Sequence, residues 1–365
     1  MIFMINIKQK EMLLGHTRLG DPVTISLNIQ EMPNYHMTIQ GASGSGKTHA
    51  LKNYALQAAA LGFPVIIIDS SGSYKLSEEE KAWGFSSAIT PVTINVYQHG
   101  IDINPFQSLQ LDTDLEERRV DTALRVTELF SHVLCLGSRQ ENTLYEAMLS
   151  MMTIMPGNIE HKIQTLLELI HDTRGAHANS LYGKLKPLFD QKIFTVDKSS
   201  FNAYKPGYVY IYDLQFFTDD TKQFLSDIIL WHIWNQATLR GNINHKTFII
   251  LDEAQLFNHS SNSPIARMLT EGRKVGIGLW LGTQFINNNF SKTAISRIQQ
   301  SSTKIYFKPN DCDLKGIAKE IDPNNNNWTQ LLKNLKLGEC IAAYTKNTSA
   351  GMRSKQILLK VPADI

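Results

Sequence analysis

Residues 37–53 read MTIQGASGSGKTHALKN and place a glycine-rich turn between a short apolar segment and a helical pattern. The turn fits the pattern GxxxxGKT. In such a turn, successive backbone N–H groups point inward around phosphate oxygens, and glycine tolerates the torsions that this requires. The helix that follows directs the positive end of its dipole at the same anion. We therefore predict a phosphate-binding loop made of Gly41, Ala42, Ser43, Gly44, Ser45, Gly46, Lys47 and Thr48.

The chemistry of this loop predicts ATP and Mg²⁺ as its ligands. Lys47 carries the charge that reaches the β- and γ-phosphates, and the Thr48 hydroxyl is suited to ligate Mg²⁺. Residues 247–253 read TFIILDE, an apolar strand that would deliver Asp252 to the edge of a sheet, where its carboxylate can hold the metal through water. Glu253 can then polarise the attacking water as a general base. Alone, this segment could be an ordinary strand with an acidic cap, but beside a phosphate loop the catalytic interpretation is favoured.

Two further polar residues flank the apolar segment 276–283. Gln284 follows it, and a polar residue at the tip of that strand can sense the γ-phosphate or align the water. A solvent-exposed turn residue is the alternative. Arg273 precedes the segment in the sequence EGRK. Cations at a helix end interact favourably with the helix dipole, whereas the sharper hypothesis is that Arg273 reaches the ATP of a neighbouring subunit. The residues alone leave both alternatives open.

Apolar runs of strand length alternate with helical patterns along much of the chain. Continuous Ile and Val runs separated by helices indicate a parallel sheet that is buried on both faces. The predicted strands cover residues 35–40, 64–69, 92–97, 208–214, 247–252 and 276–283, and two more close the chain at 338–344 and 356–361. We predict an α/β fold with a mainly parallel sheet.

The chain divides into three parts by pattern. Residues 1–34 contain a weak hairpin signal with alternating apolar residues around a turn. Residues 111–204 lack a convincing strand and are typical of helices over 114–136, 139–152, 159–171 and 178–190. We predict a short N-terminal β-hairpin, an all-helical insertion at 111–204, and a core built from residues 35–110 and 205–365.

Composition limits the function classes. The 365 residues include 42% hydrophobic residues, which excludes a largely disordered chain. The formal net charge is +2, so any contact with nucleic acid must come from local patches or from an assembly that concentrates them. Three scattered cysteines favour a reducing, cytoplasmic compartment. No targeting segment is apparent, and no apolar run approaches the roughly 18 residues needed to span a bilayer.

Taken together, the order and spacing of several blocks resemble the HerA/FtsK superfamily of P-loop motor ATPases, with HerA-like ATPases, type IV secretion ATPases and conjugative coupling proteins as the nearest groups. The matching blocks are LLGHTRLGDPV, MTIQGASGSGKTHALKN, PVIIIDSSGSY, GIDINPF, GYVYIYDLQ, TFIILDEAQ, EGRKVGIGLWLGTQ, SSTKIYFK and LGEC. The resemblance implies a RecA-like core that assembles as a hexameric ring.

The resemblance also implies roles for individual residues. The phosphate loop binds ATP, and Asp252 and Glu253 serve its hydrolysis. Gln284 looks like the sensor glutamine of the family. Arg273 resembles the arginine that acts in trans in coupling proteins, and Arg297 is a second candidate for a contact between subunits.

The sequence departs from the family pattern in places. Where many members read DP-x-GEY, this chain has DSSGSY at 69–74, so a glutamate is missing. Thirty-four residues are too few for the N-terminal β-barrel of HerA, and the transmembrane hairpin of coupling proteins is not seen. We therefore expect a stripped-down motor core without a membrane span.

Three functions remain open at this stage. The leading hypothesis is an ATP-driven motor that moves DNA through a ring. The loops at Leu256–Ser263 and Ser70–Lys75 are candidate pore loops, although ordinary solvated loops explain them equally well. The alternatives are a peripheral cytoplasmic ATPase that energises type IV secretion or conjugation, and a nucleotide-gated scaffold for a partner nuclease.

Overall fold

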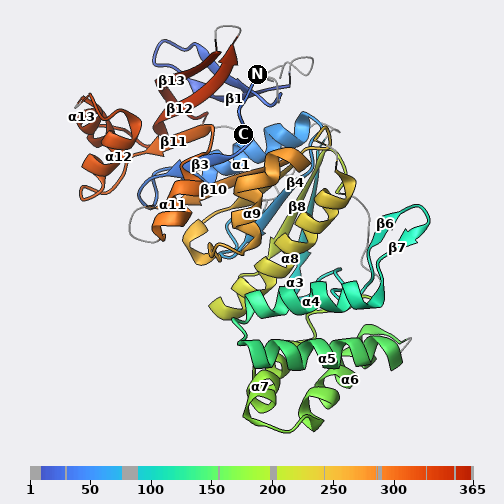
Figure 1. Cartoon of the computed structure of the whole chain (residues 1–365). Helices are drawn as coiled ribbons and strands as arrows, with labels where there is room; N and C mark the ends of the chain where they lie inside the picture. Colours follow the sequence, from blue (N-terminus) through green and yellow to red (C-terminus); the bar gives the residue numbers. More distant parts are fainter. Residues whose placement is uncertain are drawn as a thin grey trace.

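A computed structural model describes residues 10–28, 31–75, 89–154, 157–197, 204–241, 243–284, 286, 290–325, 327–348 and 351–362. Eleven strands in these ranges form one sheet, in the order β2-β1-β13-β12-β11-β3-β10-β9-β4-β8-β5. The strands cross the upper body of the molecule in Figure 1, and a group of helices hangs below them.

The seven strands at one side of the sheet are all parallel. They are β11 (Thr303–Phe307), β3 (Met37–Gln40), β10 (Ile277–Thr283), β9 (Thr247–Leu251), β4 (Val65–Asp69), β8 (Tyr208–Asp213) and β5 (Thr90–Asn95). Strands β4, β9 and β10 are buried along their whole length, as their continuous apolar sequences require. All six strands predicted for this part lie within two residues of their predicted bounds, and the α/β fold with a mainly parallel sheet is confirmed.

Four antiparallel strands extend the sheet beyond β11. They are β12 (Glu339–Thr348), β13 (Gly351–Lys360), β1 (Glu11–His16) and β2 (Pro22–Ser26). The predicted N-terminal hairpin is present as β1 and β2, and its first strand pairs with β13 instead of forming a separate unit. Strands β12 and β13 are both longer than predicted, because their outer halves are polar and carry no apolar run.

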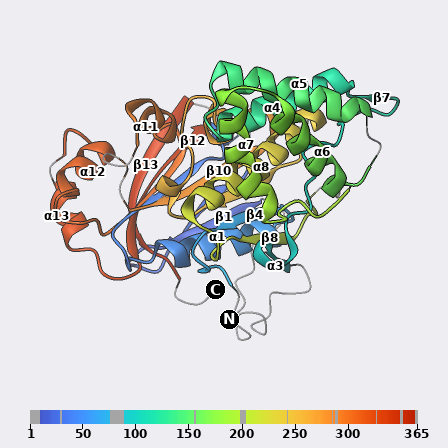
Figure 2. The same cartoon turned by 90° about the horizontal axis from the view of Figure 1, so that it is seen from below.

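Helices cover both faces of the parallel strands. Helix α1 (Lys47–Ala60) packs in one hydrophobic cluster with residues such as Ile67 and Ile250, whereas α8 (Asp219–Arg240) and α9 (Pro264–Glu271) share another with Ile66 and Leu251. Figure 2 shows α1 and α8 on opposite sides of β4 and β8. The short helices α3 (Val96–His99), α11 (Lys292–Ile298), α12 (Leu314–Ile321) and α13 (Asn327–Lys333) lie in connections.

The helical insertion contains α4 (Arg119–Val133), α5 (Ser138–Ile154), α6 (Ile159–Asp172) and α7 (Ala176–Asp190). The prediction that this stretch contains only helices is wrong at its start. There β6 (Gln110–Asp112) and β7 (Leu115–Glu116) form a small hairpin, so α4 begins at residue 119 instead of 114. Both strands are short and exposed, so no apolar alternation indicates them. The division of the chain into three domains stays a prediction.

The insertion is attached to the sheet at two adjacent points. Its incoming and outgoing segments meet in an isolated parallel bridge between Ile101 and Phe194. Its core is continuous with the core beneath the sheet, because Phe130 of α4 packs on Phe224 of α8 with ring centroids 5.8 Å apart. Figure 1 shows α4 lying against α8, with α5, α6 and α7 further from the sheet. Among the described residues, no helix is both long and apolar enough to cross a membrane.

Candidate active site

The phosphate loop lies where the sequence predicts it, between the end of β3 and the start of α1. Gly46 adopts a left-handed conformation at the head of α1, with φ of 112°, which L side chains rarely tolerate. The Lys47 Nζ atom donates hydrogen bonds to the carbonyl oxygens of Gly41 at 2.9 Å and Ala42 at 3.1 Å. Burial lowers the pKa of Lys47, and the nearby charges of Glu253 and Asp252 act in the opposite direction. The loop therefore holds a buried cation directly at the head of a helix.

Asp252 lies at the carboxyl end of β9 and reaches the first turn of α1. Its Oδ2 atom accepts a hydrogen bond from Thr48 Oγ1 at 2.6 Å. The same oxygen accepts a second hydrogen bond from the phenol of Tyr74 at 3.1 Å. The strand between β9 and β3 is β10, and Gly282 on it leaves room for this carboxylate, since a Cβ there would stand 2.4 Å from Asp252 Oδ1. The two predicted metal ligands, Thr48 and Asp252, are therefore in direct contact.

Glu253 follows directly and is held by two glutamines. It adopts a left-handed conformation, with φ of 51°, which is uncommon for a residue with a side chain. Its carboxylate accepts hydrogen bonds from Gln255 Nε2 and, at 3.3 Å, from Gln284 Nε2. Gln255 in turn accepts a hydrogen bond from Thr283 Oγ1 at 3.0 Å. The structure thus brings Glu253 and Gln284 together at the carboxyl edge of the sheet.

Three residues of the site were not predicted from the sequence: Tyr74, Gln255 and Thr283. Tyr74 belongs to the loop 70–75 after β4, and Asp69 organises this loop by accepting backbone N–H groups from residues 71 to 74. The position of this loop beside β9 follows from the strand order, which no local pattern of the sequence specifies. A usable signal exists for all three residues, because each lies at the carboxyl end of a buried parallel strand, the edge where ligands of such sheets bind.

The two arginines proposed for subunit contacts lie elsewhere. Arg273 is exposed just before β10, at the amino edge of the parallel strands, where its charge opposes the burial that raises the pKa of Tyr35. Seven residues of β10 separate this edge from Gln284, which corresponds to roughly 20 Å. Arg297 donates a hydrogen bond to Ser261 at 3.2 Å within the same chain. Within the described residues, neither arginine forms a hydrogen bond or an ion pair with the phosphate loop of its own chain.

A family model described as the central domain of helicase HerA matches residues 12–233, well over half of the chain. The chain belongs to this HerA family. The matched range contains the phosphate loop and the whole insertion, and it ends before Asp252, Glu253, Arg273 and Gln284.

Individual relatives agree with this membership. The HerA-family chain is 21% identical over 341 residues to the DNA double-strand break repair helicase HerA of Saccharolobus solfataricus, an alignment that includes 88% of this chain. The chain spans 64% of the length of that relative. VirB4 of Thermoanaerobacter pseudethanolicus superposes with a TM-score of 0.68 over 96% of both chains at 21% identity. The plasmid coupling protein TrwB in complex with an ATP analogue superposes with a TM-score of 0.65 over 98% of this chain and 92% of TrwB at 13% identity. These structures share the fold.

The residues of the HerA-family site fit a nucleotide and Mg²⁺. The buried Ser45 hydroxyl in the phosphate loop has no partner among the described residues. Thr48 and Asp252 supply one hydroxyl and one carboxylate, which suits Mg²⁺ because this ion is usually held by one or two protein oxygens, water and substrate phosphates. Within the described parts of the chain, no cluster of three or more His, Cys, Asp or Glu residues could hold a metal alone. A hydroxyl and a carboxylate are a donor set that nucleotide phosphates and water could complete around Mg²⁺.

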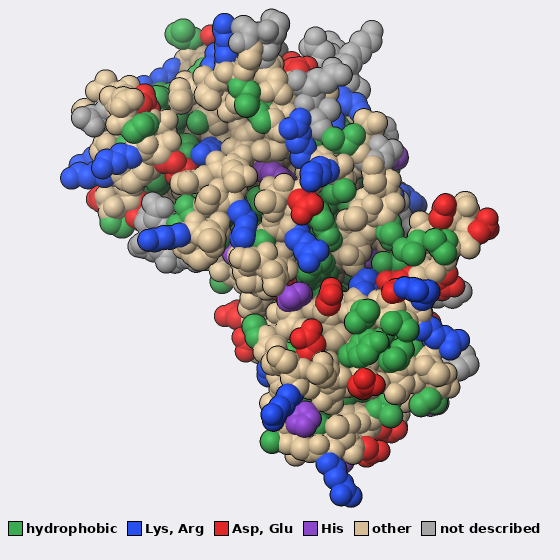
Figure 3. All heavy atoms as spheres, in the orientation of Figure 1, with side chains coloured by type: hydrophobic (Ala, Val, Ile, Leu, Met, Phe, Trp, Pro, Cys, Tyr) green, Lys and Arg blue, Asp and Glu red, His purple; other side chains and the backbone are tan. Residues whose placement is uncertain are grey.

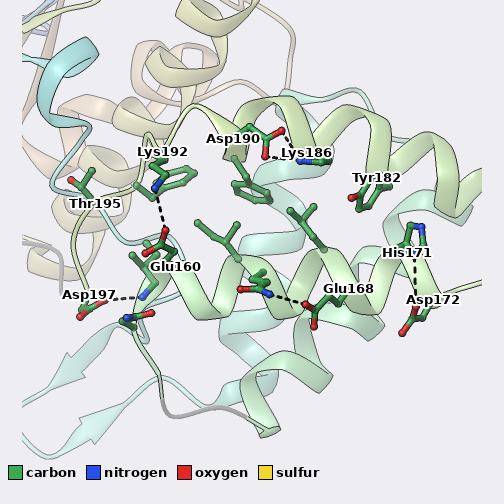
Figure 4. Close-up of a pocket in the computed structure, with 17 residues that line it drawn as sticks. Glu160, Glu168, His171, Asp172, Tyr182, Lys186, Asp190, Lys192, Thr195 and Asp197 are labelled. Atoms are coloured by element: carbon green, nitrogen blue, oxygen red, sulfur yellow. Dashed lines mark hydrogen bonds and ion pairs between the residues drawn. The ribbon is translucent and has the colours of Figure 1, made fainter.

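A large hollow lies far from this site, between α6 and α7 of the insertion. Its volume is about 920 Å³. Figure 4 shows charged side chains around an apolar floor, with Glu160 paired to Lys192 at 3.3 Å and Lys186 paired to Asp190 at 2.7 Å. These rim charges already have partners in the chain, and no residue of the phosphate loop lines the hollow. It is a surface groove of the insertion and no part of the candidate active site.

Proposed function

We propose that this HerA-family chain hydrolyses ATP to ADP and phosphate with Mg²⁺, and that it works as a ring-forming DNA translocase in the cytoplasm. The observation that carries the proposal is the convergence of four side chains from three different segments beside the phosphate loop. Thr48, Asp252, Glu253 and Gln284 are linked by hydrogen bonds at one edge of the sheet.

Each residue has a distinct task in this proposal. The backbone N–H groups of the phosphate loop and Lys47 bind the phosphates. Thr48 and Asp252 hold Mg²⁺, which neutralises charge on the phosphate oxygens when it is bound. Glu253 accepts the proton of the attacking water, and Gln284, whose amide contacts Glu253, orients that water or reports the γ-phosphate.

The position of Arg273 supports a ring. An arginine at the opposite edge of the sheet cannot serve the nucleotide of its own chain, but it is exposed and free to meet the site of a neighbouring copy. A repeated head-to-tail contact of this kind closes into a ring when the rotation permits. We propose a homohexamer on the resemblance to ring-forming motors, with DNA as cargo because a relative is a DNA repair helicase.

A second candidate function is an ATPase that energises conjugation or type IV secretion. Its support is the superposition of TrwB, described as a bacterial conjugative coupling protein, over 98% of this chain. The third possibility, a nucleotide-gated scaffold for a partner nuclease, fits less well because Glu253 is present and positioned. Stimulation of the ATPase by duplex DNA would favour the DNA translocase, and an ATPase that does not respond to DNA would favour a function without DNA.

The test is a Glu253→Gln variant. The amide keeps the shape of the side chain but cannot accept a proton, so ATP should bind normally and hydrolysis should fall by about 10²–10⁴-fold. Lys47→Ala should instead lose tight ATP binding. Glu146→Gln, an exposed position on α5, is the matched control and should behave as wild type. Normal turnover by Glu253→Gln would exclude Glu253 as the base.

A further inference from the structure

The hairpin of β12 and β13 extends beyond the rest of the sheet. Strand β11 pairs with β12 only from Cys340 to Tyr344, whereas the pairing of β12 with β13 continues to Thr348 and Gly351. Every residue from 351 to 356 is exposed. We call residues 345–348 and 351–355 the distal hairpin. In Figure 1 it projects at the top of the molecule, away from the helical insertion.

Three cations share one face of the distal hairpin. The register places Lys346 directly opposite Arg353 and Tyr344 directly opposite Lys355. Side chains alternate along a strand, so residues 344, 346, 353 and 355 all point to the same side. Lys346 has a distant ion pair with Glu31 at 3.9 Å. Arg353 and Lys355 have no ion pair with any described residue of the chain. Figure 3 shows Lys and Arg side chains at this end of the molecule.

This arrangement does not serve the stability of the hairpin. Like charges that face each other across two strands repel and destabilise the pair. The sequence from residue 341 to 361 contains no Asp or Glu that could offset them. Thr345 and Ser354 on the other face, with hydroxyl oxygens 3.3 Å apart, add polar groups and no negative charge. Glu31 is the one acid paired with this cluster among the described residues, and it contacts only Lys346. A cationic cluster with so little internal compensation indicates an external anion.

We propose that the cationic face of the distal hairpin, formed by Lys346, Arg353 and Lys355, contacts the phosphate backbone of DNA. Alternate residues on a strand lie about 6.8 Å apart and opposite residues about 5 Å apart, so the three charges form a short regular array. DNA presents a regular array of phosphates, each strand carrying one charge per about 3.4 Å of helix axis. The chain has a formal net charge of only +2, so its contact with DNA must be concentrated in such patches. This inference rests on the proposed function as a DNA motor.

The experiment compares two triple variants of the full chain. Lys346→Gln/Arg353→Gln/Lys355→Gln removes the patch. The matched control Lys315→Gln/Lys319→Gln/Lys333→Gln removes three exposed charges from α12 and α13. Affinity for a fluorescent 30-base-pair duplex is measured over a series of salt concentrations. In a plot of log affinity against log salt concentration, each lost phosphate contact reduces the magnitude of the slope by about 0.9. The hairpin variant should therefore lose up to about 2.7 of this magnitude, and its affinity near 0.1 M salt should fall roughly tenfold to a hundredfold.

Further readouts separate the outcomes. The hairpin variant should keep its basal ATPase and melt no lower than wild type, and the charge-retaining Lys346→Arg/Lys355→Arg should bind DNA as wild type does. If wild type binds DNA and the hairpin variant matches the control, the inference is wrong while the DNA motor stands. If wild type binds no DNA at low salt, the proposed DNA motor fails first. Loss of assembly with unchanged DNA binding would assign the patch to a contact between copies and overturn the inference.

Discussion

At the scale of residues, a single carboxylate oxygen connects two parts of the site. Asp252 Oδ2 accepts two hydrogen bonds. One comes from the Thr48 hydroxyl in the first turn of α1, and the other comes from the Tyr74 phenol in the loop after β4. Burial and the neighbouring acids, Asp252 first among them, raise the pKa of Tyr74, so the phenol keeps the proton that it donates to Asp252. Lys75, the next residue, pairs with Asp213 at the end of β8 at 3.1 Å. One loop thus ties the ends of three strands together.

We predict that Tyr74→Phe weakens Mg²⁺ binding, so that about tenfold more Mg²⁺ is needed to reach the same ATP affinity. The ring still fills its space, but Asp252 loses the donor that orients it, and groups that orient a metal ligand are worth on the order of tenfold in metal affinity. ATP affinity is titrated at several Mg²⁺ concentrations. Tyr54→Phe is the control, because it removes a buried phenol whose hydrogen bond goes to Leu14 O, away from the site. An unchanged Mg²⁺ dependence would show that Tyr74 is only packed there.

The close packing at Gly282 leads to a second prediction at the scale of residues. A methyl group at this position would press on Asp252 Oδ1 at 2.4 Å and on Leu51 at 2.8 Å, so Gly282→Ala must displace the carboxylate or the strand. We expect hydrolysis to fall at least tenfold and the melting temperature to drop. Gly183→Ala in α7 is the contrasting variant, since its Cβ meets nothing within 4 Å and alanine favours a helix. Full activity of Gly282→Ala would mean that Asp252 can move without consequence.

At the scale of elements, the sequence predicted best what local pattern determines. Buried parallel strands are continuous apolar runs, so β4, β9 and β10 and the phosphate loop were readable. The hairpin of β6 and β7 was missed because its strands are short and exposed. The outer half of β12 was missed because it is polar. Tyr74 and Gln255 were missed because their contacts depend on the order of strands in the sheet, which only tertiary packing decides.

Helix α8 carries a carboxyl group in an unusual environment. Burial raises the pKa of Asp227 to about 7, although Asn258 in the loop after β9 donates a hydrogen bond to it at 3.0 Å. Between the ordinary pKa of 3.8 and about 7, the folded chain holds a proton that the unfolded chain has released. The stability from this proton is therefore fully present below about pH 4 and lost as the pH rises through 7, a change of at most about 4 kcal/mol.

We predict that Asp227→Asn removes this pH dependence. The amide oxygen can still accept a hydrogen bond from Asn258, and no proton is lost, so the variant should melt higher than wild type at pH 8 and nearly as wild type does at pH 4. Melting temperatures between pH 4 and 8 provide the measurement. Asp220→Asn, an exposed acid in the first turn of the same helix, should leave the wild-type profile unchanged. A parallel shift of Asp227→Asn at all pH values would contradict the prediction.

At the scale of the whole molecule, the two edges of the parallel sheet carry different functional residues. The carboxyl edge holds the phosphate loop, Asp252 and Glu253, and the amino edge presents Arg273 to solvent. A guanidinium can neutralise charge that develops on the γ-phosphoryl oxygens, and such arginines contribute on the order of 10³–10⁵ in rate. The structure gives Arg273 no task in its own site, so its function, if catalytic, belongs to an assembly.

We predict that Arg273→Ala and Glu253→Gln chains are each nearly inactive and regain part of the ATPase when mixed. Mixed assemblies contain some interfaces with an intact Glu253 on one side and an intact Arg273 on the other. Steady-state ATPase is measured across mixing ratios, with assembly followed by native mass. Lys274→Ala is the control, because this neighbouring cation pairs with Glu271 at 3.9 Å. Mixed oligomers without recovery would exclude the trans role, and Arg297 would be tested next.

The bridge between Ile101 and Phe194 also bears on how the chain folds. Strand β8 pairs with β5, yet more than a hundred residues separate Asn95 from Tyr208, and closing so long a loop is slow. Helices α4 to α7 make mainly sequence-local contacts and can form early. Once they bring Ile101 to Phe194, the loop that β8 must close shrinks to roughly twenty residues. Substitutions that weaken α5 or α6 should therefore slow refolding more than they speed unfolding. The insertion would then assist the folding of the sheet that it interrupts, because its own early folding brings β5 and β8 close together.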